Sequence, residues 1–188
     1  MFHKILIANR GEIAVRLIRA VHDMDIQSVA IFSQDDAQAL HVQLAGQAVA
    51  LPETGPSAYL NMDNVIAIAQ TQGCDAIHPG YGFLSERADF AQACAQAGLV
   101  FIGPDPAHLQ LFGDKASARQ LALSCGVPLM PGLNHAVTLQ EVQDFFTAQQ
   151  GAGVMIKAIG GGGGRGMRAV FKAEDLPEAF ARCTSEAR

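Results

Sequence analysis

The opening of the chain alternates short aliphatic runs with an amphipathic helical pattern. Residues 5–8 (Ile-Leu-Ile-Ala) are too few for a helix and predict a buried strand. A second aliphatic run follows at residues 28–32, and apolar side chains recur between the runs at helical spacing, namely Ile13, Leu17, Ile18, Val21 and Met24. A strand, a helix and a strand make a βαβ unit, whose strands are parallel. The alternation continues to about residue 103, so we predict an α/β fold with an open parallel sheet of the Rossmann type.

Capping residues mark where the predicted helices begin. Asn9 precedes the first helix and Glu12 stands three residues later, so we expect a capping box there. Residues 35–45 are also expected to form one helix, and further helices are expected after Asn61, Asp114 and Thr138. In open α/β sheets, ligands bind beyond the carboxyl ends of the strands. We therefore expect loops 9–11 and 78–85 to line a site.

The pattern changes after Gly103. Several predicted helices are followed by an apolar strand at residues 154–158, a run of glycines, and a second strand at 167–171. A last helix, starting near Asp175, is expected to be cut off by the chain end. We predict a Rossmann-like domain over residues 1–113 and the first part of a second, incomplete domain over residues 114–188.

Five consecutive glycines, Gly160, Gly161, Gly162, Gly163 and Gly164, join the two late strands. Glycine loses the most backbone entropy on folding, so such a run indicates backbone N–H groups that approach a ligand closely, typically phosphate. A flexible linker would normally include serine. The run lacks the Gly-Lys-Ser/Thr of a Walker A loop, and a strand follows it where a dinucleotide fingerprint requires a helix. We therefore predict a hairpin loop that covers a nucleotide.

Two of the four lysines stand where they could meet phosphates. Lys157 lies in the strand that leads into the glycines, between apolar neighbours, where a charge is costly unless it meets an anion. Lys115 begins a predicted helix, an unfavourable end for a cation. Together with the glycine loop, we expect both ammonium groups to bind phosphate oxygens.

Composition excludes several classes of protein. With 49% hydrophobic residues and a net charge of -5, the chain is neither disordered nor suited to gripping nucleic acid or an anionic membrane by bulk charge. No apolar run approaches the ~18 residues that span a bilayer. The beginning of the chain lacks a signal-peptide pattern, so we expect a cytoplasmic protein. The four cysteines form no Cys-x-x-Cys pair, and we expect them to be reduced and mostly buried.

Five segments in order carry a family resemblance: Ile-Ala-Asn-Arg-Gly-Glu-Ile-Ala at 7–14, His-Pro-Gly-Tyr-Gly-Phe-Leu-Ser-Glu at 78–86, Phe-Ile-Gly-Pro at 101–104, Gly-Asp-Lys at 113–115, and the loop at 157–167. The chain resembles the biotin carboxylase component of biotin-dependent carboxylases, which are ATP-grasp enzymes. The resemblance implies a reaction of ATP, bicarbonate and magnesium through carboxyphosphate, which carboxylates N1 of biotin on a carrier domain. A carboxyltransferase then passes the carboxyl group to a final acceptor, which this sequence does not encode.

The resemblance also implies roles for individual residues. Lys115 and Lys157 match lysines that bind ATP phosphates, the five glycines match the loop over the nucleotide, and Met167 matches a residue near the adenine. Tyr81 and Gly82 resemble the wall of the biotin and bicarbonate end, while His78 and Glu86 shape that turn. Arg16 and Arg19 lie where family members form a homodimer, and an ordinary solvated helix face is an equal alternative for them.

The chain departs from the family pattern at three places. Ile159 replaces a small hydroxyl residue, and Ala152-Gly153 replaces an aromatic and a proline. The family's magnesium ligands and catalytic residues would lie beyond residue 188, and the only acidic residues expected near the loop are Glu174 and Asp175. The 188 residues are therefore expected to be inactive alone. A non-catalytic nucleotide- or subunit-binding module and a carbamoyl-phosphate-synthesising ATP-grasp ligase remain as alternatives.

Overall fold

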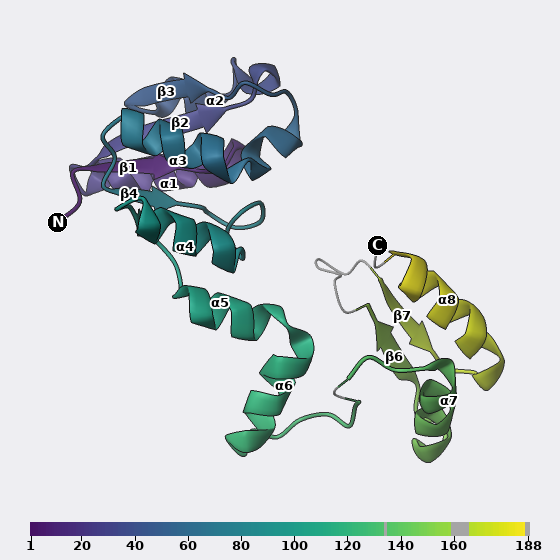
Figure 1. The fold of residues 1–188 in the computed structure, drawn as a ribbon. Coiled ribbons are helices and arrows are strands. Elements are labelled where there is room, and N and C mark those ends of the chain that lie inside the picture. Colours follow the sequence, from purple (N-terminus) through teal and green to yellow (C-terminus); the bar gives the residue numbers. More distant parts are fainter. Residues whose placement is uncertain (134, 159–165, 187–188) are drawn as a thin grey trace. The chain divides into compact units, whose positions relative to one another are not determined.

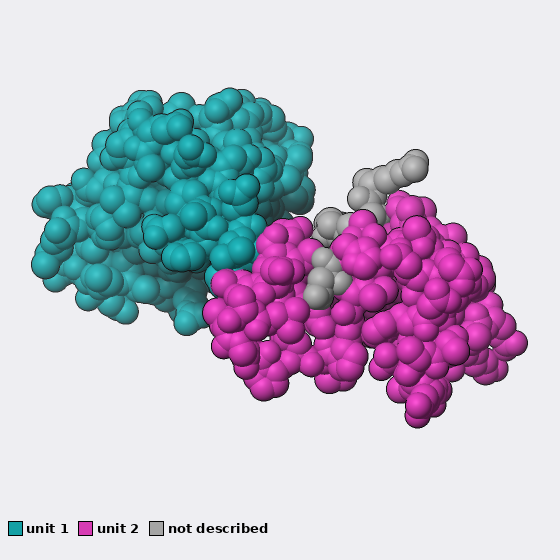
Figure 2. Space-filling model, turned by 60° about the horizontal axis from the view of Figure 1, so that its bottom comes forward, with its two compact units in different colours: residues 1–113 teal, residues 114–188 magenta. Residues whose placement is uncertain are grey.

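The computed structural model describes residues 1–133, 135–158 and 166–186. The chain divides into two compact units, Met1–Gly113 and Asp114–Arg188, which Figure 2 shows in separate colours. Each unit has its own hydrophobic core, so each is described by itself.

Unit 1 is built on a sheet that has five parallel strands among the described residues. The strands are β1 (Lys4–Ile7), β2 (Gln27–Phe32), β3 (Gln47–Ala50), β4 (Ala76–His78) and β5 (Val100–Phe101), in the order β3-β2-β1-β4-β5. This confirms the predicted Rossmann-type sheet. The strand order reverses between β1 and β4, which is the position where open α/β sheets bind ligands beyond the carboxyl ends of their strands. We refer to the surface formed there by residues 78–85 and the amino end of α1 as the crevice.

Helices cover both faces of this sheet because successive side chains of a strand point to opposite faces (Figure 1). Ile5 and Ile7 pack against α1 (Gly11–Asp23), whereas Leu6 packs with residues of α3 (Met62–Thr71) and α4 (Ala88–Gln96). The remaining helices of the unit are η1 (Gln34–Asp36), α2 (Leu40–Leu44), η2 (Pro56–Leu60) and α5 (Pro106–Gly113). No helix in the described ranges is long and apolar enough to cross a membrane.

Unit 2 is a hairpin of two antiparallel strands with helices on one face. Its elements are α6 (Lys115–Ser124), α7 (Leu139–Ala148), β6 (Val154–Lys157), β7 (Met167–Val170), η3 (Ala173–Asp175) and α8 (Leu176–Glu186). Val154, Ile156 and Val170 pack between the strands and the helices α7 and α8, which lie on the same side of the hairpin in Figure 1. The other face of the hairpin is therefore left uncovered by the described residues of this unit.

Helix boundaries follow the predicted caps where the cap is local. Asn61, Asp114 and Thr138 each accept a backbone N–H three residues later, and Thr138 forms the expected capping box with Glu141. The first helix differs, because its N-cap is Arg10, with no side-chain cap, and the capping box predicted for Asn9 and Glu12 is wrong. The single helix predicted over 35–45 is divided into η1 and α2.

Met24 and the cysteines differ in how well the sequence predicted their burial. Met24 was expected on the apolar stripe of α1, but it lies at the C-cap and is 67% exposed. Within the described residues the cysteines are free, with Cys74, Cys94 and Cys183 buried and Cys125 exposed, as predicted. Burial raises the pKa of the Cys74 and Cys94 thiols to about 11, which keeps them protonated and unreactive.

Candidate functional site

The loops that follow β1 and β4 are joined by the side chain of Asn9. Asn9 is buried, and its Nδ2 donates hydrogen bonds to the carbonyl oxygens of Pro79 (2.7 Å) and Tyr81 (2.9 Å). Its Oδ1 accepts the N–H of Arg10 at 2.9 Å. The carboxamide is thus occupied by the neighbouring loop, which is why it does not cap α1.

The loop after β4 is held in an unusual backbone conformation. Gly80, Gly82 and Phe83 have positive φ values of 68°, 69° and 45°. The N–H of Gly80 donates to His78 Nδ1 at 3.0 Å, and burial lowers the pKa of His78, which keeps the ring a neutral acceptor. A Cβ on Gly80 would lie 2.6 Å from Asn9 Nδ2, so the close approach of the two loops requires glycine there.

Tyr81 and Gly82 project from this loop into solvent at the carboxyl edge of the sheet. The Tyr81 side chain is 64% exposed, and its hydroxyl donates to Glu12 Oε1 at 3.4 Å, a long hydrogen bond. The crevice therefore presents a phenol and a left-handed glycine beside the amino end of α1. Such a wall can bind a small polar ligand through a hydroxyl and backbone groups.

A network of charged and hydroxyl groups lies behind the crevice, at the carboxyl ends of β1 and β2. Arg10 binds the Asp36 carboxylate through two nitrogens, with Nε at 2.6 Å from Oδ2. The Tyr59 hydroxyl donates to Asp36 Oδ2 at 2.8 Å and accepts the N–H of Ser33 at 3.1 Å. The Tyr59 ring lies 5.2 Å from that of Phe83, which connects this network to the strained loop.

The pairing and burial of these groups shift their pKa values. The hydrogen bonds from Arg10 lower the pKa of Asp36 to about 2, while burial raises the pKa of Tyr59 to about 12. Burial also lowers the pKa of the nearby His41. The sequence places Arg10 in a loop expected to line a site, but Asp36 and Tyr59 belong to no motif and were not predicted. The position of Asp36 soon after β2, at the ligand-binding edge of the sheet, is the signal that could have indicated it.

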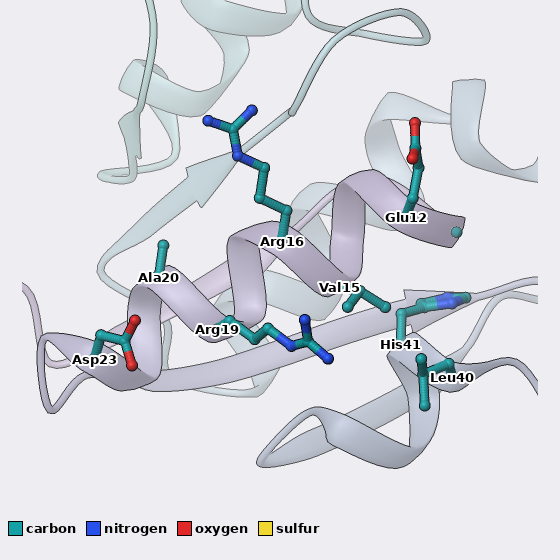
Figure 3. A pocket seen from close by; sticks show the side chains of 9 residues that line it. Glu12, Val15, Arg16, Arg19, Ala20, Asp23, Leu40 and His41 are labelled. Carbon is teal, nitrogen blue, oxygen red and sulfur yellow. The ribbon is translucent and has the colours of Figure 1, made fainter.

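Arg16 and Arg19 lie on the exposed side of α1, outside the crevice. They border a pocket of ≈ 670 Å³ whose lining includes Glu12, Asp23 and His41. In Figure 3, Arg16 and Arg19 project from different sides of the helix. The structure therefore places both guanidinium groups where another molecule can reach them.

The open face of the unit 2 hairpin carries two of the residues predicted to bind a nucleotide. Lys157 and Met167 are directly opposite each other in the β6–β7 register, and both side chains are exposed. Met155 lies on the same face and is 50% exposed. The predicted cost of burying the Lys157 charge does not arise in this chain, because strand alternation directs that side chain away from the core.

The other predicted nucleotide contacts lie elsewhere. Lys115 is the exposed first residue of α6, a helix that does not pack extensively against β6 or β7 in the described part of the chain. Gly160, Gly161, Gly162, Gly163 and Gly164 lie outside the described residues. The hairpin face thus brings together Lys157 and Met167. Lys115 lies on α6 and is not part of that face.

Glu186, at the end of α8, holds the end of the hairpin loop. Its Oε2 accepts the N–H of Gly166 at 3.1 Å, and its Oε1 pairs with Arg168. Gly166 has a φ of 67°, and a Cβ there would lie 2.6 Å from the Cβ of Ala158. The expectation that only Glu174 and Asp175 are acidic residues near the loop is therefore wrong, because α8 returns a distant carboxylate to it.

The donor set fits a nucleotide better than a metal ion. The hairpin face offers an ammonium group beside methionine side chains, which can contact a phosphate and an apolar base respectively. Among residues 1–133, 135–158 and 166–186, no group of three His, Cys, Asp or Glu side chains is placed to hold a metal ion.

Comparisons with known proteins divide the chain at nearly the same place as its two compact units. Residues 1–109 match the family model described as "Biotin carboxylase, N-terminal domain", and residues 114–188 match "Carbamoyl-phosphate synthase L chain, ATP binding domain". The chain is 49% identical over 191 residues to a pyruvate carboxylase of Aspergillus terreus, covering 100% of this chain and 16% of the relative. It is 45% identical over 186 residues to the human protein "Pyruvate carboxylase, mitochondrial", covering 98% of this chain and 16% of the relative.

A solved structure gives the same assignment. The biotin carboxylase domain dimer of Hydrogenobacter thermophilus 2-oxoglutarate carboxylase, in complex with magnesium ADP, ADP and bicarbonate, matches with a TM-score of 0.94 and 39% identity. The match covers 100% of this chain and 41% of that one. The chain thus spans a small part of its relatives' length. Since the first family model matches more than half of its residues, the chain belongs to the biotin carboxylase family.

Proposed function

We propose that this chain is the N-terminal portion of an ATP-dependent biotin carboxylase. In the complete protein, ATP, bicarbonate and carrier-bound biotin would give carboxybiotin, ADP and phosphate. Residues 1–113 would form its Rossmann-like N-terminal domain, and residues 114–188 the first part of its ATP-grasp region with the nucleotide lid. The observation that carries the proposal is the pairing of Lys157 with Met167 on the open face of the hairpin.

On that face, Lys157 would bind phosphate oxygens and Met167 would contact the adenine. Lys115 and the glycines Gly160, Gly161, Gly162, Gly163 and Gly164 would add phosphate contacts. ATP, with magnesium, supplies the phosphoryl group that activates bicarbonate. The residues of this chain would bind and orient it, while the magnesium ligands and the catalytic residues would come from outside residues 1–188.

The crevice of unit 1 would serve the other substrates. Tyr81 and Gly82 would form the wall against which the biotin ring and bicarbonate are held. The exposed Tyr81 hydroxyl and the open backbone at Gly82 support this role, because a ureido ring and bicarbonate both need hydrogen-bonding groups.

The partners follow from the same proposal. A biotin carrier domain would deliver biotin, and a carboxyltransferase would receive the carboxyl group. Arg16 and Arg19 would contact a second copy of the protein in a homodimer, a role that their exposure on α1 supports. We propose no nucleic-acid or membrane partner, and we propose the cytoplasm as the compartment, which subcellular fractionation would test.

The test is a substitution in the intact protein that contains this chain. Lys157→Ala should raise KM for ATP by about tenfold or more, because a charge-assisted contact to phosphate is lost. Lys172→Ala is the matched control, since Lys172 is also an exposed lysine of unit 2 but pairs with Glu174. An unchanged KM for ATP in the Lys157 variant would overturn the nucleotide role of the hairpin face.

A second assay separates the alternatives. The 188-residue chain alone should show no bicarbonate-dependent ATP hydrolysis, and such activity would contradict an incomplete cleft. If the intact protein binds ATP without turnover, a non-catalytic module is favoured. The second family model also names carbamoyl-phosphate synthase. ATP cleavage that requires a nitrogen donor in place of biotin would favour that class of ligase.

A further inference from the structure

Asn9 occupies the position where sequence predicts a helix cap, yet its side chain does something else. It is 2% exposed, and its Nδ2 donates to two carbonyl oxygens in the loop after β4, those of Pro79 and Tyr81. These partners lie on either side of Gly80. A carboxamide has two N–H donors on one nitrogen, so this arrangement uses both of them.

The loop that receives these hydrogen bonds is strained. Besides two glycines, Phe83 adopts a left-handed conformation with a φ of 45°, which is rare for a bulky residue. Such conformations persist only where surrounding contacts enforce them, and they concentrate at functional sites. The conformation of this loop therefore depends on what holds it.

The loop is held by contacts with several groups, and three of these groups act on different parts of it. His78 Nδ1 accepts the N–H of Gly80 inside the loop. The Tyr59 ring contacts the ring of Phe83 at the far end. Asn9 alone among these binds the carbonyl of Tyr81, the residue whose side chain faces the crevice. The peptide group that joins Tyr81 to Gly82 is therefore oriented by Asn9.

We propose that Asn9 is a positioning residue that orients Tyr81 and Gly82 for the acceptor substrate. The identity of that substrate, biotin with bicarbonate, rests on the proposed function. Because Asn9 binds the Tyr81 carbonyl, the peptide group between Tyr81 and Gly82 keeps one orientation. The Tyr81 phenol and the Gly82 N–H are thereby held in a single orientation at the crevice. Asn9 and its partners Pro79 and Tyr81 all belong to unit 1, whereas the proposed ATP contacts Lys157 and Met167 belong to unit 2. Substitution of Asn9 should therefore weaken biotin binding and leave ATP binding nearly unchanged.

The first test measures the loop itself in the intact protein. Asn9→Asp keeps the size of the side chain but removes both donors, and Asn9→Ser keeps one donor on a shorter side chain. Amide hydrogen exchange in residues 78–85 should rise by about tenfold or more in both variants, because local opening becomes easier. Unchanged amide hydrogen exchange in residues 78–85 of a folded variant overturns the proposal. If Asn9→Asp does not fold, the result for Asn9→Ser decides the test.

Ser28→Ala is the matched control. Ser28 is also buried in the sheet of unit 1, and its Oγ accepts the N–H of Gly46 at 3.0 Å. It lies at the amino end of β2, away from the carboxyl edge that forms the crevice. Its substitution should increase exchange near Gly46 and leave residues 78–85 unchanged.

The second test is kinetic and separates positioning from folding. In Asn9→Ser, KM for free biotin should rise by about fivefold or more while KM for ATP stays within about twofold; in Ser28→Ala both should stay within about twofold. The positioning role is overturned if the KM values for biotin and ATP change equally. It is also overturned if amide hydrogen exchange in residues 78–85 is faster but KM for biotin is unchanged. If the unsubstituted protein shows no biotin-dependent ATP cleavage, the proposed function fails, and hydrogen exchange by itself still decides whether Asn9 holds the loop.

Discussion

The crevice of unit 1 and the hairpin face of unit 2 hold their candidate binding residues in different ways. In the crevice, Tyr81 is positioned by hydrogen bonds from Asn9, which lies far away in the sequence and is buried. On the hairpin, Lys157 and Met167 are opposite each other only because β6 and β7 pair. Both of those side chains are exposed.

This difference predicts different consequences of substitution. Residues behind the crevice belong to the core of unit 1, so changes there should reduce the free energy of unfolding as well as function. Lys157 and Met167 on the open hairpin face are exposed, so changes there should reduce binding and leave stability nearly unchanged.

Gly80→Ala should have the largest effect, a loss of about 3 kcal/mol in the free energy of unfolding. It combines a left-handed φ with a Cβ only 2.6 Å from Asn9 Nδ2. Gly98→Ala is the control, because Gly98 has a similar φ of +75° but nothing within 4 Å of the added Cβ, and should cost about 1 kcal/mol. Urea denaturation followed by circular dichroism would measure both. Equal losses would show that Asn9 moves aside freely.

Asp36→Asn should cost about 2 kcal/mol at pH 7, because Arg10 and Tyr59 lose a charged partner. Asp35→Asn is the control, since Asp35 is exposed and, within the described part of the chain, its side chain accepts only the N–H of Gly55, a bond that an amide oxygen can replace. The expected loss there is below about 0.5 kcal/mol. A comparable loss in the two variants would contradict the special role of the network.

The effect of Asp36 should also depend on pH. Folding lowers the pKa of Asp36 from 3.8 to about 2, so the carboxylate stabilises the folded state fully above pH 3.8. That contribution is lost as the pH falls through about 2. The difference in unfolding free energy between the unsubstituted chain and Asp36→Asn should therefore shrink between these two values. A difference that stays constant over this range would show that the charge is not what matters.

Tyr59→Phe should cost about 1 kcal/mol, because the buried N–H of Ser33 loses its acceptor and Asp36 loses a donor. The phenyl ring keeps the contact with Phe83, so the loop should stay in place. Tyr81→Phe, at the other tyrosine of the chain, should change the unfolding free energy by less than about 0.5 kcal/mol because that hydroxyl is exposed. If Tyr81→Phe proved the more costly, the assignment of the buried network would be wrong.

Glu186→Gln should have the smallest effect, about 0.5 kcal/mol, because its pair with Arg168 is partly exposed. Hydrogen exchange at Gly166, whose N–H Glu186 accepts, should rise locally, because the single amide oxygen of Gln is drawn to the Arg168 guanidinium and Gly166 loses its acceptor. Glu178→Gln removes a similar but purely helical pair with Arg182 and should leave Gly166 unchanged. Exchange at Gly166 that does not respond to Glu186→Gln would remove Glu186 from the hairpin loop.

The sequence predicted correctly several features that depend on neighbours along the chain. The caps at Asn61, Asp114 and Thr138 form as expected because each side chain reaches an N–H three residues away. Asn9 fits the same pattern, but its best partners are the carbonyls of Pro79 and Tyr81, some 70 residues later. A local rule cannot weigh a partner that only the folded sheet brings within reach.

The candidate site shows the same limit. The hairpin that carries Lys157 and Met167 follows from two short strands around a glycine run, which the sequence shows directly. Their direct pairing is set by the strand register, which only the structure gives. The network of Arg10, Asp36 and Tyr59 and the role of Glu186 could not be predicted. These residues come together only when separate strands and helices pack, and the sequence contains no spacing that marks them.

For this protein, the sequence by itself determined the alternation that makes a parallel sheet, the late hairpin and the motifs of the biotin carboxylase family. Short-range periodicity decides the sheet and the hairpin, since burying an apolar stripe or face needs only a regular spacing of side chains. The family motifs are recognised from the residues themselves. The tertiary structure alone decided which polar groups pair behind the crevice and what Asn9 does. Buried donors and acceptors must find partners, and the nearest partner in space is set by strand order and not by sequence distance.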